Sequence, residues 1–256
     1  MRMFFIGLCL IREFYVNLHL QSQKVSTMNE RHRKKRLTAW RFFLALPRSL
    51  WYNLRLLPFR QAIHMPILIS HRTVVQNVSG KIILHSEKPK MGLVKIGFGT
   101  CQCTDFRYNR TILNIRGTFE TLGECTLGAG SAVEVAENAI LTVGNNFNLG
   151  PKSLIICHKA MTFGNDFLTS WNCTLMDTDQ HSLVDSDGQI TNPDREISVG
   201  NNVWLGCNCL VTKGTTLADS ITVAAGSTLH GSYPEPRTVL AGNPATIVKR
   251  GVERGN

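Results

Sequence analysis

The strongest constraint on the fold is a six-residue repeat between residues 199 and 228. Each of five consecutive hexads begins with an aliphatic residue, and a second side chain, mostly small or aliphatic, follows four positions later. The first set is Val199, Leu205, Val211, Leu217 and Val223; the second is Val203, Cys209, Thr215, Ile221 and Ser227. If the chain turns a corner every six residues, three hexads close a triangular coil and one aliphatic side chain per hexad points to a shared axis. Stacked coils then bury one continuous apolar column.

The same spacing continues upstream, which extends the predicted coils over residues 95–256. Val143, Leu149 and Ile155 keep it, and after a slip of two residues Phe163, Thr169 and Leu175 resume it. We therefore predict an all-β fold, a parallel β-helix whose strands pair with those of the coils above and below. Its ends need caps, for which a helical arm over residues 1–60, a connecting segment over residues 61–94 and the short tail after Tyr233 are available.

The net charge of +10 belongs to the N-terminal arm. Residues 1–60 carry twelve Lys and Arg against Glu13 and Glu30, whereas residues 61–256 carry sixteen basic and sixteen acidic residues. A nucleic-acid enzyme would carry its positive surplus on the folded domain. We therefore expect no nucleic-acid partner.

Apolar and aromatic residues recur at helical spacing within residues 37–63, among four arginines and two prolines. This pattern predicts a basic amphipathic helix, which can lie on anionic lipid headgroups. It fits equally a helix packed on the rest of the domain with its arginines in water. Peripheral membrane contact through residues 1–60 and a purely capping role both remain open.

Residues 1–20 are apolar, but Arg12 and Glu13 interrupt them and no small-residue cleavage site follows. Neither a signal peptide nor a membrane span is predicted. The eight cysteines include no C-x-x-C motif, which favours buried free thiols over a zinc ribbon. We expect a cytoplasmic protein, able to lie at the inner face of the membrane, whose translation starts at Met1 or Met28.

Three short motifs accompany the hexads: Asn-Val-Trp-Leu-Gly at 202–206, Ala-Ala-Gly-Ser at 224–227 and Ala-Gly-Asn-Pro-Ala at 241–245. Together they resemble the hexapeptide-repeat acyltransferases of left-handed parallel β-helix fold, in particular the galactoside, maltose and capsule or lipopolysaccharide O-acetyltransferases. The resemblance covers residues 95–250. It implies left-handed coils, a homotrimer, acetyl-CoA as co-substrate in the groove between neighbouring prisms, and a saccharide acceptor near a histidine.

The hexads are interrupted between Leu175 and Val199. The intervening loop, residues 177–196, contains six acidic residues and a single histidine, His181. A polar loop of this length more often carries a function than merely connects two strands. The resemblance implies that His181 is the general base, since an imidazole can take the proton of an attacking hydroxyl near neutral pH. A surface histidine hydrogen-bonded to a neighbouring Asp is the other interpretation.

The resemblance also assigns residues to the acceptor. Asn172 matches a position whose amide contacts the sugar, and an amide suits hydroxyl groups because it both donates and accepts. An Asn at a coil corner is the equally weighted alternative. Asp179 would orient the acceptor or the imidazole, and Trp204 would form a wall of the acceptor and thioester site.

For acetyl-CoA, the resemblance implies backbone contacts to the pantetheine arm at Cys207 and Ala225. A backbone N–H near Cys207 could also stabilise the tetrahedral oxyanion. Lys249 and Arg250 would meet the phosphates, although exposed basic residues near a C-terminus are ordinarily just solvated.

The predicted reaction is direct transfer of acetyl from acetyl-CoA to a saccharide hydroxyl, with no metal. Two alternatives to this reaction remain, a zinc enzyme and a scaffold without activity.

His158 and His230 also lie in or beside the coils, so three histidines meeting at a trimer interface could bind zinc, as in carbonic anhydrases of β-helical fold. A non-catalytic β-helix scaffold would need neither the twenty-residue loop nor His181.

Overall fold

The computed structural model describes residues 40–86, 89–99, 101 and 108–255. It divides into two compact units, Met1–Leu44 and Ala45–Asn256. In the first unit the described residues, 40–44, are helical. The expectations about the start at Met1 or Met28 and about the rest of the arm up to residue 39 lie outside the described residues. In the second unit residues 45–56 are helical, and α2 (Phe59–Ala62) and strands β1–β23 follow. Among the described residues, no helix is both long enough and apolar enough to cross a bilayer.

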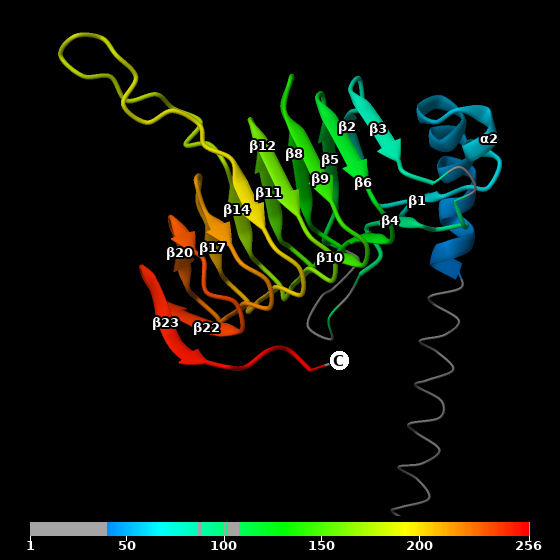
Figure 1. Ribbon diagram of the computed structural model, residues 1–256. Coiled ribbons are helices and arrows are strands. Elements are labelled where there is room, and N and C mark those ends of the chain that lie inside the picture. Colours follow the sequence, from blue (N-terminus) through cyan, green and yellow to red (C-terminus); the bar gives the residue numbers. More distant parts are fainter. Residues whose placement is uncertain (1–39, 87–88, 100, 102–107, 256) are drawn as a thin grey trace, which may run out of the picture. The chain divides into compact units, whose positions relative to one another are not determined.

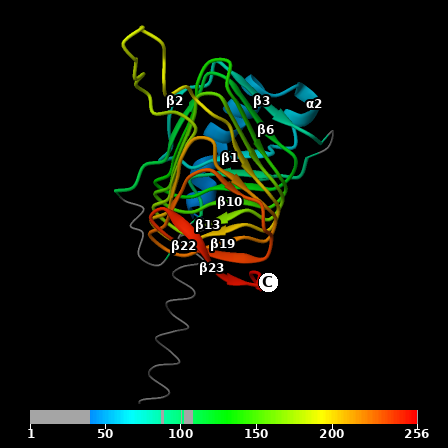
Figure 2. The same ribbon diagram turned by 60° about the vertical axis from the view of Figure 1, so that its left-hand side comes forward.

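The strands form three sheets, here called faces A, B and C, and every third strand returns to the same face (Figure 1, Figure 2). Face A contains β1 (Ile67–Ile69), β4 (Val94–Ile96), β7 (Cys125–Leu127), β10 (Phe147–Leu149), β13 (Leu168–Thr169), β16 (Trp204–Leu205), β19 (Thr222–Val223), β22 (Thr238–Gly242) and β23 (Ala245–Arg250). Face B contains β2 (Val74–Asn77), β5 (Ile112–Ile115), β8 (Ala132–Val135), β11 (Leu154–Cys157), β14 (Thr174–Met176), β17 (Leu210–Val211) and β20 (Thr228–Leu229). Face C contains β3 (Lys81–Leu84), β6 (Thr118–Thr121), β9 (Ile140–Val143), β12 (Ala160–Phe163), β15 (Ile197–Val199), β18 (Thr216–Leu217) and β21 (Ser232–Tyr233).

The pairing is parallel throughout the three faces, except that β23 runs antiparallel to β22. The fold is a left-handed parallel β-helix with an N-terminal helix, as the sequence predicted. Both sets of hexad residues point inward, because all ten side chains are at most 3% exposed. Phe147, Phe163 and Phe167 fill the middle of the same column, with ring centroids 4.7–5.2 Å apart.

Small and amide residues stand at the corners between the strands. Asn202, Asn208 and Ser220, six or twelve residues apart, all have positive φ (54°, 58° and 59°), and Gly226 continues the series. Positive φ suits glycine and asparagine best among the common residues. A Cβ at Gly206 would lie 2.6 Å from the backbone nitrogen of Ala225 in the next coil, so a side chain there would force adjacent coils apart.

Strands are also found within residues 61–94, which the sequence analysis treated as a connecting segment and cap. β1, β2 and β3 pair in parallel with β4, β5 and β6. The repeat is hidden there because the coil is long: Ile67 pairs with Val94, 27 residues on, whereas Trp204 pairs with Thr222, 18 residues on. Extra loop residues therefore break the six-residue spacing.

The helix over residues 45–56 covers the outer edge of β1, the first strand of face A. Asn53 accepts the backbone N–H of Ile67 at 3.1 Å and donates to the carbonyl of the same residue at 2.7 Å. Ser49 Oγ accepts the N–H of Ile69 at 2.9 Å. Two polar side chains thus satisfy backbone groups that an uncovered sheet edge would leave open to pairing with another chain.

We predict that Asn53→Ala lowers the free energy of unfolding by about 2–4 kcal/mol, since Asn53 is fully buried and its loss strands a buried N–H and a buried C=O of Ile67. Urea unfolding at equal protein concentration measures the change. Gln76→Ala, which removes an amide from an exposed position of β2, is the matched control. Equal midpoints for the two variants would show that the cap is not needed.

Candidate active site

The loop over residues 177–196 leaves the corner between faces B and C, after β14 and before β15, and projects from the coils (Figure 1). Asp177 anchors its start: the fully buried carboxylate accepts the backbone N–H groups of His158 (2.7 Å) and Lys159 (2.9 Å). Burial raises the pKa of Asp177, while these hydrogen bonds oppose that rise. Asp177 is therefore a structural anchor of the loop.

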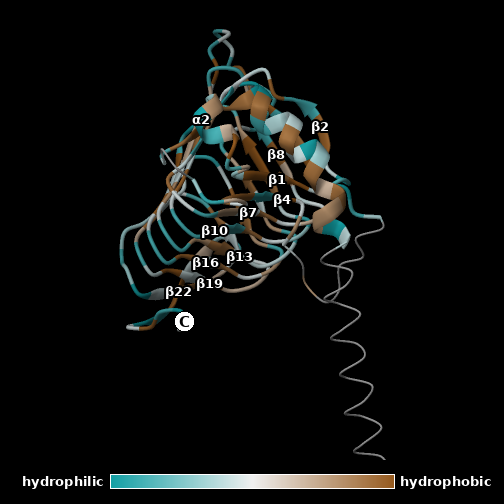
Figure 3. Cartoon of the chain, turned by 90° about the vertical axis from the view of Figure 1, so that its right-hand side faces the viewer, coloured by the Kyte–Doolittle hydropathy of each residue, from teal (hydrophilic) through white to brown (hydrophobic). Residues whose placement is uncertain are grey.

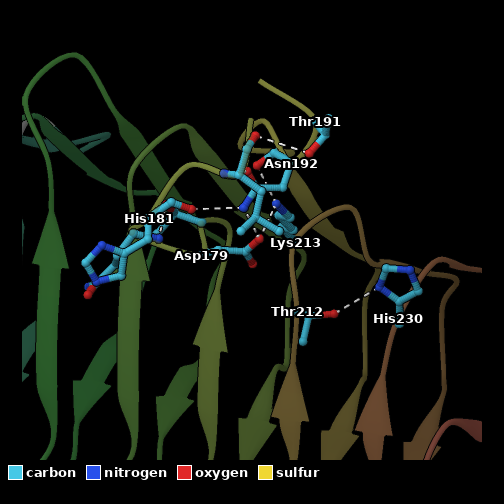
Figure 4. A network of polar contacts seen from close by, with 10 residues as sticks. Asp179, His181, Thr191, Asn192, Thr212, Lys213 and His230 are labelled. Carbon is cyan, nitrogen blue, oxygen red and sulfur yellow. Dashed lines mark hydrogen bonds and ion pairs between the residues drawn. The ribbon is translucent and has the colours of Figure 1, made fainter. Parts of the chain in front are cut away.

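Lys213 joins the two ends of the loop (Figure 4). Its ammonium lies 2.6 Å from Asp179 Oδ2 and donates to the backbone carbonyl of Asn192, also at 2.6 Å. Asn192 Nδ2 in turn donates to Asp179 Oδ2 (2.8 Å) and to the carbonyl of His181 (2.9 Å). Hydrogen bonds from Lys213 and Asn192 lower the pKa of Asp179. We call Asp179, Asn192 and Lys213 the loop clamp.

The clamp holds the backbone of His181 and leaves its side chain outside. In Figure 4 the imidazole points away from the clamp. The His181 side chain is exposed. Within the described part of the chain, the hydrogen bond of His181 is the one that its backbone carbonyl accepts from Asn192. Neither Asp177 nor Asp179 is hydrogen-bonded to the ring. Both ring nitrogens are therefore open to a ligand.

A second group of predicted residues lies at the corner between faces A and B. Asn172 has φ of +59° there and donates from Nδ2 to Asn208 Oδ1 at 2.6 Å, so its role as a corner residue is observed. Cys207 and Ala225 occupy the same corner in consecutive coils, where the Gly226 N–H donates to the Cys207 carbonyl. The backbone N–H groups of Cys207 and Ala225 have no acceptor among the described residues. They remain available to a ligand.

Trp204 lies on face A, in a groove of about 720 Å³. Its indole N–H donates to Ser170 Oγ at 3.2 Å. Other strand residues that line the groove are Asn148, Leu168, Thr169, Thr222 and Val239, and the C-terminal residues 252–255 form part of its wall. Arg254 holds this tail by donating to the carbonyl of Asp166 at 3.0 Å. The groove fits an extended ligand better than a metal ion.

Lys249 and Arg250 end β23, the last strand of face A, and both are exposed. Arg250 Nε lies 2.9 Å from Glu235 Oε1. Lys249 has no carboxylate partner among the residues that the structure describes. Of the two residues predicted to contact the phosphates, Lys249 is therefore the one whose charge is not already paired.

One chain brings the predicted residues together in two groups that lie apart. Asn172, Cys207 and Ala225 are at the A–B corner beside the Trp204 groove, whereas His181 and Asp179 are at the B–C corner. The strands of face B separate the two corners. A single chain therefore does not place the candidate base beside the candidate acyl site.

The sequence analysis missed Lys213 and Asn192. A signal existed for the lysine, because it is the one Lys or Arg between residues 199 and 228, in a chain whose loop carries six acidic residues. For the zinc alternative, the described residues contain no group of three His, Cys, Asp or Glu side chains close enough to share a metal ion.

Comparison with known proteins gives the following relatives. No family model matches the sequence. A protein of Escherichia coli K12 assigned to lipopolysaccharide biosynthesis as an O-acetyl transferase is 29% identical over 134 residues, which cover 49% of this chain and 68% of that protein. The galactoside O-acetyltransferase of the same organism is 28% identical over 138 residues, 53% of this chain and 66% of that enzyme. Among solved structures, the polySia-specific acetyltransferase NeuO superposes with a TM-score of 0.51 at 20% identity, over 72% of each chain.

The chain resembles the hexapeptide-repeat acetyltransferases. The hexads, the three-faced parallel coils and these relatives all point to that family, which the sequence motifs also resemble. The chain spans about two thirds of the length of the two bacterial relatives.

We predict that Lys213→Gln loosens the loop over residues 177–196. A partly exposed charged hydrogen bond contributes about 1 kcal/mol, so amide hydrogen exchange in residues 177–196 should rise about fivefold at neutral pH. Lys159→Gln, which removes an exposed lysine 3.7 Å from Glu196 at the same corner, is the control. Unchanged exchange in Lys213→Gln would mean that the clamp does not order the loop.

Because the pKa of Asp179 is lowered in the folded protein, the clamp is fully formed above the usual pKa of an aspartate and is lost as the pH falls through the lowered value. The effect of Lys213→Gln should therefore be present at neutral pH and disappear in acid.

Proposed function

We propose that this protein is an acyl-CoA-dependent O-acetyltransferase that transfers acetyl to a hydroxyl group of a saccharide. The proposal draws its substrate class from relatives named for galactosides, polySia and lipopolysaccharide biosynthesis. The observation that carries it is the pair of sites: a histidine with a free ring on a clamped loop, and unpaired backbone N–H groups beside a groove.

The separation of these two sites supports a homotrimer. In a closed ring of three copies, the B–C corner of one copy can face the A–B corner of its neighbour, and this would join His181 of one chain to Trp204 of the next. Acetyl-CoA would then bind between two copies. The Ala225 N–H suits its amide-rich pantetheine arm, and the Cys207 N–H suits the thioester at the end of that arm. Lys249 suits the phosphates of CoA, whereas Arg250 is already paired with Glu235 and would be shared between Glu235 and a phosphate.

The proposed reaction is a single displacement without an acyl-enzyme. His181 takes the proton of the acceptor hydroxyl while the hydroxyl oxygen forms a bond to the thioester carbonyl carbon. The N–H of Cys207 donates to the oxyanion that develops on the carbonyl oxygen. The carbon–sulfur bond then breaks, and the imidazolium returns its proton to the departing thiolate. The products are an acetyl ester and the free thiol of CoA.

The acceptor residues take unequal parts in this scheme. Asn172 uses one amide hydrogen on Asn208 and is exposed, so the rest of its amide can bind a sugar hydroxyl. Trp204 would form the wall against the sugar and the thioester. Asp179 is held by Lys213 and Asn192, and it would orient His181 through the loop clamp.

The donor places the reaction in the cytoplasm, where acyl-CoA is made. Saccharides that are built on lipid carriers would be presented at the inner face of the membrane, and contact of residues 1–60 with that surface forms part of the proposal.

We predict that His181→Ala lowers kcat by about 10² to 10⁴ and leaves the CoA affinity and the oligomeric state unchanged, because the base acts on the acceptor proton alone. Asn172→Ala should mainly raise the KM for the acceptor. Thiol release from acetyl-CoA, measured with saccharide, amino-sugar and amino-acid acceptors, supplies the readout.

His85→Ala, at an exposed histidine away from both sites, is the control. A near-normal kcat in metal-free His181→Ala protein would refute the assignment of the base. Stoichiometric zinc with loss of activity to chelators would favour a metal enzyme, and no CoA binding at all would favour a scaffold.

A further inference from the structure

The helix over residues 45–56 buries polar side chains and exposes apolar ones, the reverse of an ordinary surface helix. Ala45, Ser49 and Asn53, spaced four apart, are fully buried. The side chains of Ser49 and Asn53 form hydrogen bonds with the backbone of β1. Leu50 and Leu54 are 45% and 51% exposed on the same turns. A surface helix ordinarily turns its apolar side to the core. Capping a strand edge therefore accounts for the buried face and leaves the outer apolar side chains unexplained.

The exposed side chains extend from this helix into α2. Five large apolar residues of residues 50–63 are 45–72% exposed, and we call them the apolar ridge: Leu50, Trp51, Leu54, Phe59 and Ile63. Figure 3 shows brown, hydrophobic residues interspersed with teal, hydrophilic ones in the helix and α2. Exposed apolar side chains gathered on one short segment mark a surface for contact with another apolar phase.

Positive charge accompanies the ridge and acidic charge is absent. The sequence contains no Asp or Glu between residues 31 and 86. Arg48, Arg55 and Arg60 lie among the ridge residues, and in the described part of the chain none of them is paired with a carboxylate. The Arg55 guanidinium lies 5.0 Å from the Trp51 ring centroid. Apolar and aromatic side chains interleaved with unneutralised arginines are the composition of a helix that lies in a lipid interface.

We propose that the apolar ridge docks on an anionic lipid surface. Its apolar side chains enter the boundary between headgroups and acyl chains, and the three guanidinium groups pair with lipid phosphates. A second copy of the chain is a poorer occupant, because two such faces would bring unpaired arginines together. The proposal rests on the membrane contact proposed above for residues 1–60 and names the side chains that make it; it concerns binding alone and does not depend on the acetyl transfer.

Co-sedimentation of the full chain with vesicles of equimolar phosphatidylglycerol and phosphatidylcholine tests the proposal. We expect Leu54→Gln/Phe59→Gln to weaken binding about tenfold, since interfacial binding scales with buried apolar area. The control Leu122→Gln/Ile140→Gln makes the same change at β-helix residues that are 52% and 46% exposed, and it should bind like the wild type. Measurement at raised salt screens the charge of all the exposed basic residues, those before position 37 included, so that the apolar contribution is compared by itself.

The charge on the ridge has its own test. Arg55→Gln/Arg60→Gln should bind the mixed vesicles about tenfold more weakly and leave the weaker binding to pure phosphatidylcholine unchanged. Tryptophan emission should be quenched by brominated lipid, and the quenching should fall in Trp51→Phe but not in Trp171→Phe.

Three results would overturn the proposal. The ridge variant could bind vesicles as tightly as the wild type at raised salt. Trp51→Phe could leave the quenching unchanged. The wild type could bind no vesicles while the ridge variant changes the sedimentation coefficient, which would make the ridge a contact between copies.

Discussion

The structure depends on a corner that the chain can turn every six residues. Each corner needs a residue with positive φ, supplied at Asn202, Asn208 and Gly226, and a site without a side chain where the next coil approaches, as at Gly206. Between corners only two residues are needed per strand in the last coils, one of which faces inward. Most of each strand is therefore committed to packing and pairing, and the corners carry the groups that can vary.

The candidate site follows from this division. The loop with His181 is an enlarged B–C corner, and the unpaired N–H groups of Cys207 and Ala225 belong to A–B corners. A triangular coil keeps its corners apart, so two corners of one chain cannot close on one substrate. An assembly of copies can bring them together. Lys213 is also a corner residue. From the B–C corner of the next coil it reaches both ends of the loop.

The sequence predicted the parts of the molecule that repeat. The hexads identified the β-helix and one inward residue per hexad, from Val199 to Val223, and their interruption located the His181 loop. The structure added that the second set, from Val203 to Ser227, is buried as well. β1–β3 were missed because their longer coil breaks the spacing. Lys213 stood out as the one cation of the last hexads, but its partner could not be predicted, since Lys213 is 34 residues from Asp179 and meets it only after two coils are stacked. The polarity of the N-terminal helix was also hidden, because sequence spacing does not say which side of a helix a strand edge will occupy.

The central claim is that the active site is shared between two copies of the chain, and subunit complementation tests it most directly. His181→Ala and Trp204→Ala chains, each inactive alone, are co-expressed and the mixed assemblies are assayed for acetyl transfer. The account predicts that activity returns, because a mixed trimer contains a junction with an intact His181 from one copy and an intact Trp204 from the next. A mixture as inactive as either variant alone, with mixed assembly verified, would contradict it.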